Sequence, residues 1–413
     1  MTSIERHEAR YQRRKHKRDL KKEVLRAKTF DEVFSFENIY KAAKKCCNNS
    51  RWKSSVINFE NKLLLETQRI YDEIRQDERH FIGFNSFSTI EHGKLRNIDA
   101  LPIKERAAQK CLCQNILSEL YSKSFIYENS ASLKGKGMDF ALRQLKKQLS
   151  HHYRKYGLEG GIYQFDFKNY FASLPHSEIK RRIKERFKDE RLQKLFCSYV
   201  DDFQQLRIKP AAAHGIGLGS EVSQIIALDY TSPIDHYIKN KCKIKGYGRY
   251  MDDGYIISNS LTELNKIKEE INLLARKLGI RINQKKNTIT PFKHHSFSFL
   301  KMKISLTPTG KILFKLNKQS TKAMKRKIRI FHAWFKQHKM SAEDIIQSYQ
   351  SWRAHAKRCN SYQILTSMDN YFYKYFQPQI QYRKNKFCST IPLIKTNLGW
   401  ICQKEFYGVY HTS

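Results

Sequence analysis

The sequence has few acidic residues: 39 Asp and Glu face 78 Lys and Arg in 413 residues, which leaves a formal net charge of +39. No apolar run approaches the roughly 18 residues that a membrane span needs, and residues 1–10 contain no apolar signal-peptide core. The nine cysteines are scattered without a C-x-x-C pair, which indicates neither a disulfide framework nor a zinc ribbon. These absences predict a soluble cytoplasmic protein with buried, reduced thiols.

The composition nevertheless supports a folded chain with an anionic partner. Hydrophobic residues make up 40% of the sequence and aromatic residues 13%, which is enough for a sizeable core and excludes overall disorder. An unneutralised surplus of positive charge would repel itself, so we expect a polyanion, and nucleic acid before a membrane surface. The length predicts two or three domain-sized units of roughly 100–200 residues each.

The N-terminal segment is the most basic part of the chain. Residues 6–22 contain nine Lys or Arg and neither Pro nor Gly. One interpretation is a solvated or disordered arm, and the other is a helix that grips phosphates. We favour the helix because the basicity extends well beyond the arm. Its nucleic-acid-binding candidates are Arg13, Arg14, Lys17 and Arg18.

The apolar periodicity predicts a mixture of helices and strands. Helical patterns cover 30–80, 177–187, 220–240, 261–278 and the region after 318. Strand patterns cover 161–167, 247–251, 254–257, 297–304 and 311–316. The strands at 247–251 and 254–257 are expected to form a hairpin. We expect 220–240 to form one helix and 297–304 to form a strand that pairs with 311–316.

Three aspartates carry the chemistry. Asp252 and Asp253 lie at the tip of the expected hairpin, where an ordinary Asp-rich turn is the alternative that the apolar flanks disfavour. Asp166 ends the strand pattern of 161–167, and it would meet the pair if the two strands lie side by side. Carboxylate oxygens are the ligands that Mg²⁺ prefers. Two such ions about 3.5–4 Å apart are the arrangement that phosphoryl transfer needs.

Several motifs around these aspartates resemble those of reverse transcriptases. The sequence 250–253, Tyr-Met-Asp-Asp, and the segment 165–171 resemble the family's palm motifs. Further resemblances follow the family's order: a fingers strand at 93–98, a template-side loop at 131–137, a third palm motif at 215–224, a lysine motif at 283–288 and a primer grip at 299–301. They cover about residues 80–305 and are most similar to stand-alone bacterial enzymes.

The resemblance implies an α+β fold of the right-hand polymerase type. Its palm would be an antiparallel sheet with helices, accompanied by fingers and an α-helical thumb. The implied divisions are a basic arm at 1–30, a helical extension with the fingers at 31–160, the palm at 161–305, the thumb at 306–377 and a tail of unknown role at 378–413.

The resemblance also assigns roles at the catalytic centre. Asp166, Asp252 and Asp253, with the backbone of Phe167, would hold two Mg²⁺ or Mn²⁺ ions. Lys286 would protonate the departing pyrophosphate, with Lys285 as runner-up, although the two could also be a solvated charge pair.

Other implied roles concern the nucleotide and the nucleic acid. Phe171 would lie against the sugar 2′ position and favour dNTPs, although it could also be a core residue. Gly219 belongs to a set of glycines that could be simple turn residues. The nucleotide-binding set is Lys94, Arg96, Phe171, Gly219, Ser223 and Gln224. The remaining nucleic-acid-binding candidates are Lys134, Lys136, Lys301, Lys325, Arg326 and Arg329.

The departures from the family pattern bear on the biological role. The third palm motif has Gly217 and Leu218 where the family has Pro and a variable residue, and Lys301 replaces the primer-grip glycine. The pair Ser223-Gln224 resembles defence-associated and diversity-generating retroelement enzymes. Nothing resembles a ribonuclease H or an integrase module.

We therefore expect an enzyme that copies a dedicated structured RNA into DNA from dNTPs, in bacterial antiphage defence. A diversity-generating retroelement enzyme is the second expectation. The remaining alternatives are an RNA polymerase or template-independent polymerase, and an inactive RNA-binding scaffold.

Overall fold

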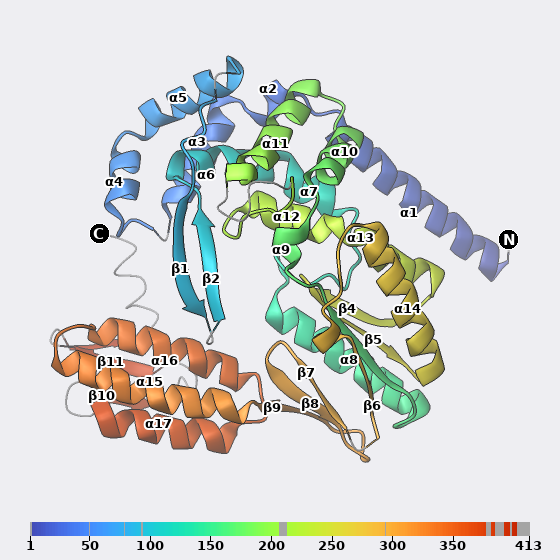
Figure 1. Cartoon of the computed structure of the whole chain (residues 1–413), viewed down its shortest axis with the longest axis vertical. Helices are drawn as coiled ribbons and strands as arrows, with labels where there is room; N and C mark the ends of the chain where they lie inside the picture. Colours follow the sequence, from blue (N-terminus) through green and yellow to red (C-terminus); the bar gives the residue numbers. More distant parts are fainter. Residues whose placement is uncertain are drawn as a thin grey trace. The chain divides into compact units, whose positions relative to one another are not determined.

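The structure is a computed structural model, and it describes residues 2–48, 50–77, 79–91, 94–205, 213–293, 295–376, 381–384, 392–396 and 399–402. Its internal contacts divide the chain into two units (Figure 1). Unit 1 comprises residues 1–148 and 160–289, and unit 2 comprises residues 149–159 and 290–413. The predicted domain limits at 30, 160, 305 and 377 stay predictions. Within the described part of the chain, no helix is both long and apolar enough to cross a membrane.

Unit 1 begins with helices. They are α1 (Ser3–Arg26), α2 (Phe30–Val33), α3 (Phe36–Cys47), α4 (Ser54–Asn61) and α5 (Leu63–Arg75), as the sequence predicts for 6–22 and 30–80. A hairpin of β1 (Asn85–Glu91) and β2 (Lys94–Ala100) follows, then α6 (Ile103–Leu112), a π-helical turn (Cys113–Leu117) and α7 (Ser118–Ser122). The apolar face of α3, which includes Ile39 and Ala43, packs against α6 and forms the centre of this helical part.

The antiparallel sheet of unit 1 positions the candidate site. Its strands are β4 (Gly246–Tyr250), β5 (Asp253–Ser258), β3 (Gly161–Asp166) and β6 (Thr288–Pro291), in that order across the sheet. The helices of this part are α8 (Met138–Tyr156, which enters unit 2 after residue 148), α9 (Tyr170–Ser173), α10 (His176–Arg186), α11 (Glu190–Asp202), α12 (Glu221–Tyr230), α13 (Ser232–His236) and α14 (Leu261–Lys277). Helix α14 packs against β3 and β5.

Aromatic side chains fill the core beneath the end of β3. Tyr163, Phe165, Phe167 and Tyr170 are all buried, and their ring centroids follow one another at 5.2–5.7 Å. A buried aromatic series of this kind fixes the strand end firmly, because interiors are close-packed and tolerate little displacement. The strand that presents Asp166 is therefore well supported.

Unit 2 contains a small sheet and a helical bundle. Strands β7 (Ser296–Phe299), β8 (Met302–Leu306) and β9 (Ile312–Leu316) form an antiparallel sheet. Three helices, α15 (Lys318–Lys336), α16 (Ala342–Lys357) and α17 (Tyr362–Phe376), share one hydrophobic core. The core includes Met324, Ile328 and Phe331, whose helical spacing in the sequence predicted α15. A second sheet comprises β10 (Gln381–Lys384), β11 (Pro392–Thr396) and β12 (Gly399–Cys402).

Two element predictions were wrong. The expected single helix of 220–240 is α12, α13 and a π-helical turn (Tyr237–Lys241), because the chain leaves helical geometry at Thr231 and Pro233 starts the next helix. The expected strand of 297–304 is two strands, β7 and β8, joined by a turn at Leu300 and Lys301. Both turn residues have positive φ, 49° and 66°, and the alternating side-chain pattern does not reveal such a turn.

Candidate active site

The hairpin of β4 and β5 ends in a two-residue turn. Tyr250 pairs with Asp253, so Met251 and Asp252 form the turn. The predicted hairpin is present, but its turn lies one residue earlier than expected, and Asp253 is the first residue of β5. Met251 has φ 58°, a left-handed conformation that costs a residue with a side chain roughly 1–2 kcal/mol. A turn that keeps this strain must be held by its surroundings.

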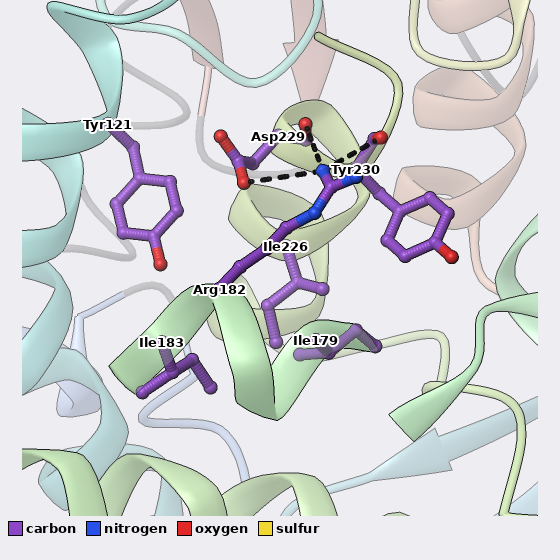
Figure 2. Close-up of a pocket in the computed structure, with 7 residues that line it drawn as sticks. All are labelled: Tyr121, Ile179, Arg182, Ile183, Ile226, Asp229 and Tyr230. Carbon is purple, nitrogen blue, oxygen red and sulfur yellow. Dashed lines mark hydrogen bonds and ion pairs between the residues drawn. The ribbon is translucent and has the colours of Figure 1, made fainter. Parts of the chain in front are cut away.

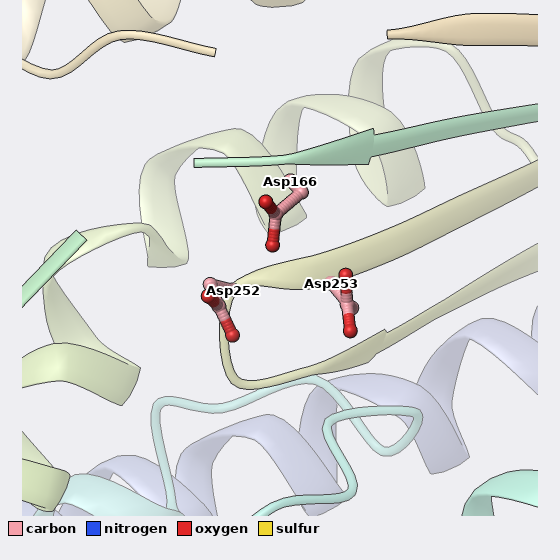
Figure 3. A group of neighbouring side chains, drawn as sticks. All are labelled: Asp166, Asp252 and Asp253. Carbon is pink, nitrogen blue, oxygen red and sulfur yellow. The ribbon is translucent and has the colours of Figure 1, made fainter. Parts of the chain in front are cut away.

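Strand β3 brings the third aspartate to the hairpin. Asp166 lies directly opposite Asp253 in the antiparallel register of β3 and β5. Asp166, Asp252 and Asp253 each offer a carboxylate oxygen, and these oxygens lie within 4.8 Å of one another (Figure 3). Three hard oxygen donors this close are suited to a divalent cation with oxygen ligands. The sequence-predicted trio is therefore brought together.

The electrostatics of the cluster disfavour three full negative charges. Burial, then the charges of Asp253 and Asp166, raises the pKa of Asp252 to about 7. Burial also raises the pKa of Asp253, although the Lys286 ammonium opposes that shift. Carboxylates that repel one another in a partly desolvated site are stabilised by a cation, which is the property that a metal site needs.

Lys286 supplies a positive charge to the cluster. Its Nζ lies 3.2 Å from a carboxylate oxygen of Asp166 and 3.2 Å from one of Asp253. Although partial burial opposes it, the charges of these two aspartates raise the pKa of Lys286. The alternative of a simple solvated pair with Lys285 does not describe this contact. The role of Lys286 toward pyrophosphate stays a prediction.

Asn283 positions this lysine, and sequence reasoning did not single it out. Its backbone N–H donates to the Asp166 carbonyl at 2.7 Å, and its side-chain amide donates to the Asp166 carboxylate at 3.2 Å. Its side-chain oxygen accepts from the N–H of Lys285 at 3.3 Å and caps the short 3₁₀ turn Gln284–Lys286. The available signal was an Asn just before a basic turn, since Asn is a preferred cap.

A buried ion pair supports the hairpin turn from below. The Arg249 guanidinium donates to both carboxylate oxygens of Asp235, at 2.8 and 2.6 Å, and the two residues are 1% and 0% exposed. It also donates to the Met251 carbonyl at 2.7 Å and to the Leu228 carbonyl at 2.9 Å. The turn that carries Asp252 is thus tied to α13 and to the end of α12. An arginine within an otherwise apolar strand was the signal in the sequence.

The predicted nucleotide-side residues all belong to unit 1. Phe171 is half-buried, packs edge-on against Tyr170 and accepts a backbone hydrogen bond from Ile216 at 2.8 Å. Gly219 has φ 132°, and a Cβ there would lie 3.1 Å from the carbonyl oxygen of Asp99, which is a residue of β2. This position therefore requires glycine for backbone reasons as well.

Ser223 and Gln224 lie in the first turn of α12. Ser223 is fully buried, and its N–H is capped by the Ser220 hydroxyl at 3.3 Å. Gln224 is half-buried. The nucleotide-binding roles of both stay predictions, as do those of Phe171 and Gly219.

Of the basic residues predicted to contact the nucleotide or the template, the structure describes the side chains of some but not of others. Lys94 and Arg96 lie on β2, but their side chains fall outside the described part. Lys134 is exposed. Lys136 donates to the carbonyls of Tyr127 and Asn129 at 2.6 and 2.9 Å, so its ammonium is already satisfied within its loop. Its nucleic-acid role stays a prediction.

The other basic candidates are not part of this cluster. Arg13, Arg14, Lys17 and Arg18 lie on α1, where all four are exposed. Lys301, Lys325, Arg326 and Arg329 belong to unit 2, the first in the β7–β8 turn and the rest on α15.

A small cavity within unit 1 has a structural role only. It holds about 10 Å³ and is lined by Tyr121, Ile179, Arg182, Ile183, Ile226, Asp229 and Tyr230 (Figure 2). Arg182 donates to the carbonyls of Asp229 and Tyr230 at 3.2 and 3.0 Å. A space of this size holds about one water molecule, so it is no substrate pocket.

Comparison with known families agrees with this geometry. Residues 86–304 match the family described as reverse transcriptase (RNA-dependent DNA polymerase), which is more than half of the chain. The chain belongs to the reverse transcriptase family. It carries the domain of an RNA-directed DNA polymerase, a nucleotidyltransferase, and the predicted α+β right-hand polymerase fold is confirmed. This domain implies dependence on a divalent metal, which the aspartate cluster could bind.

Solved telomerase structures are among those similar to this chain. Apo telomerase from Candida tropicalis, truncated from its C-terminal domain, matches 57% of this chain and 55% of its own at 14% identity and a TM-score of 0.43. Telomerase from Candida albicans in complex with the TWJ fragment of telomeric RNA matches 73% of this chain and 61% of its own, at 10% identity and a TM-score of 0.43. The chain thus spans less than two thirds of either telomerase chain. Among curated proteins, no match was found.

Proposed function

We propose that this chain synthesises DNA on an RNA template, with two Mg²⁺ or Mn²⁺ ions held by Asp166, Asp252 and Asp253. The observation that carries the proposal is the meeting of these three carboxylates at the end of β3 and the β4–β5 turn, within a reverse transcriptase domain. The bound ions would activate the attacking hydroxyl and neutralise the triphosphate. The backbone of Phe167, the residue that follows Asp166, is proposed as a further ligand.

The protein groups around the cluster have separate tasks. Asn283 and Arg249 hold the two chain segments that present the carboxylates, so the donor set is fixed before substrate arrives. The Lys286 ammonium contacts the carboxylates of Asp166 on β3 and Asp253 on β5. At this place it can stabilise negative charge that develops during the transfer. It is also the candidate to give a proton to pyrophosphate.

Selection of dNTPs is assigned to Phe171. Its ring lies next to Tyr170 in a half-buried position five residues after Asp166, where the family keeps a bulky aromatic against the sugar. A ring at that place would collide with a ribose 2′-hydroxyl. The nucleotide would then meet Lys94 and Arg96 of β2 through its phosphates, by charge-assisted hydrogen bonds.

The template is proposed to be a dedicated structured RNA, and the biological role to be bacterial antiphage defence. The net charge of +39 supports a stably held polyanion. The Ser223-Gln224 ending of the third palm motif supports the defence-associated type, and it supports a diversity-generating retroelement enzyme as the second candidate. A neighbouring repeat pair and variable gene would favour the second.

The test combines copurification with nucleotide choice. Sequencing the RNA and DNA that copurify with the protein would identify the template, the product and the priming mode together. Incorporation of dNTPs but not NTPs on an RNA template is expected, and Phe171→Ala should admit NTPs. Efficient NTP incorporation by the wild type would favour an RNA polymerase. Absence of any incorporation, with RNA still bound, would favour a scaffold.

A further inference from the structure

Among the described residues of helix α1, the hydrogen bonds and ion pairs with the rest of unit 1 lie at its C-terminal end. Leu25 is buried in the core, and the Arg26 guanidinium donates to the carbonyls of Glu185 and Arg186 at 2.6 and 3.2 Å. Glu23 forms an ion pair at 3.0 Å with Lys188, which lies just after the end of α10. Figure 1 shows α1 as one straight helix. Its 24 residues make it about 36 Å long.

The middle of the helix is open to solvent. Arg6 and every residue from Arg10 to Lys21 are exposed. A helical segment that is polar on nearly all sides and is not packed against the core needs another source of stability or a partner. The capping box supplies some: the Thr2 hydroxyl accepts from the Glu5 N–H at 3.2 Å, and the Glu5 carboxylate accepts from the Thr2 N–H at 2.8 Å.

The acidic residues of α1 lie on one side of the helix, and most of its cations lie on the other. Since successive residues are rotated by about 100°, positions i, i+4, i+7 and i+11 lie on one side of a helix. We call this side the basic stripe; it consists of Arg10, Arg14, Lys17 and Lys21, flanked by Arg6, Arg13 and Arg18. The acidic residues of the helix lie about 150° away, on the opposite side. They are Glu5, Glu8, Asp19 and Glu23, and three cations, Lys15, Lys22 and Arg26, lie nearer to this acidic side than to the stripe.

This sorting is unfavourable for the free helix. Like charges three or four residues apart each destabilise a helix by about 0.2–0.5 kcal/mol, and the stripe contains several such pairs, including Arg10–Arg14 and Lys17–Lys21. Among the described residues, no carboxylate pairs with Arg10, Arg14 or Lys17. A hydrogen bond from Lys123 and, to a smaller extent, the charge of Lys21 lower the pKa of Glu119 on α7. A solvated arm would gain stability from mixed charges on every face, so the stripe indicates an external anion.

The composition of the stripe selects the kind of anion. Single-stranded RNA is held by aromatic side chains on which bases stack, but the stripe contains none, and Tyr11 lies about 100° from its centre. A membrane surface would need a broad apolar face, which α1 also lacks. Double-stranded RNA is recognised mainly by its backbone and shape, which cations on a rigid helix can contact without bases.

We propose that the basic stripe of α1 docks on the phosphate backbone of an RNA duplex, and that the acidic side keeps the duplex on one face. This rests on the proposed function only in that the duplex would be a stem of the template RNA. The stripe from Arg6 to Lys21 is about 22 Å long, so it contacts the stem over several phosphates. The duplex would relieve the repulsion within the stripe and order the helix.

The test measures binding of a 20-base-pair RNA duplex by fluorescence anisotropy across a salt series, with the full-length protein. Each lost phosphate contact lowers the slope of log affinity against log salt by about 0.9. The variant Arg10→Gln/Arg14→Gln/Lys17→Gln should lower it by about 2.7 and weaken binding on the order of 100-fold near 0.15 M salt. Glutamine has a helix propensity close to that of Lys and Arg, so the helix itself should persist.

A matched pair of single variants tests whether duplex binding depends on the basic stripe rather than on the acidic side of α1. Lys17→Gln and Lys15→Gln remove the same charge from exposed positions two residues apart, but Lys15 lies on the acidic side. Lys17→Gln should weaken duplex binding about fivefold, and Lys15→Gln by less than about twofold. Hydrogen exchange over residues 8–22 should slow in wild type when duplex is added.

Three outcomes would overturn the proposal. They are equal effects of Lys17→Gln and Lys15→Gln, an equal stripe-dependent loss with single-stranded RNA of the same length, and an equal loss with anionic phospholipid vesicles. Wild-type dNTP incorporation is measured in parallel on a short template–primer. If incorporation persists while the stripe has no effect, only this inference fails. If the stripe binds duplex but no dNTP is incorporated, the proposed polymerase function fails.

Discussion

Removal of the buried arginine beneath the catalytic hairpin should destabilise the fold and the metal site together. Arg249→Met removes four hydrogen bonds, two to Asp235 and one each to the carbonyls of Leu228 and Met251. It leaves the Asp235 carboxylate, which is 0% exposed, without its counter-charge. Breaking a buried pair in this way costs about 3–5 kcal/mol. We therefore expect at least that loss in the free energy of unfolding.

A double variant separates the charge from the turn. Arg249→Met/Asp235→Leu leaves no unpaired charge, so it should be at least as stable as Arg249→Met alone, as seen for other buried pairs replaced by apolar residues. The Met251 carbonyl still lacks its donor, so the left-handed turn is free to relax and Asp252 moves away from Asp166. Affinity for Mn²⁺ should therefore fall in both variants, on the order of tenfold or more.

The assay is urea unfolding of metal-free protein together with Mn²⁺ titration. The control is Arg353→Met, which breaks the pair between Arg353 and Asp369 in unit 2 and should leave Mn²⁺ affinity unchanged. The reasoning is refuted if Arg249→Met costs less than about 1 kcal/mol. It is also refuted if the double variant binds Mn²⁺ as the wild type does.

Three further predictions concern the same site. In Gly254→Ala the new Cβ would lie 2.3 Å from the Phe165 ring, so we expect the free energy of unfolding, measured in urea, to fall by about 1–3 kcal/mol. The additional change Phe165→Leu should restore part of this loss. An unchanged stability of Gly254→Ala would contradict the packing. Burial and the neighbouring aspartates raise the pKa of Asp252 to about 7, so this carboxylate is protonated at lower pH. The affinity for Mn²⁺ should therefore fall up to about tenfold for each pH unit below that value. An Mn²⁺ affinity that stays constant from about pH 8 to about pH 6 would contradict this prediction. Asn283→Ala should lower kcat for dNTP incorporation about 10- to 100-fold because Lys286 loses its capped turn, and an unchanged kcat would exclude this positioning role.

The aspartate cluster was predictable from sequence because each member has a local signal. Asp252 and Asp253 lie between apolar strand patterns, and Asp166 ends a third one. Hairpin geometry and strand pairing then leave few ways to arrange the three acids. The helices of unit 2 were predictable for a similar reason, since Met324 and Ile328 repeat at helical spacing.

The supports of the cluster were harder to predict. The partners of Arg249 lie on other elements, Asp235 on α13 and Leu228 on α12, and no local pattern states that pairing. The turn at Leu300 and Lys301 was missed because positive φ is expected of Gly or Asn, not of these residues. Long-range hydrogen bonds and unusual backbone conformations are therefore what the sequence left undetermined.

The most direct measurement of the central claim is dNTP incorporation on an RNA template by Asp252→Asn. This change keeps the size of the side chain and removes the charge that a divalent cation would bind. We expect wild-type activity that requires a divalent cation, and a loss on the order of 1,000-fold or more in the variant, which should stay folded because a repelled carboxylate has been removed. Glu269→Gln, an exposed change on α14, should behave as the wild type does. Undiminished incorporation by folded Asp252→Asn would contradict the account.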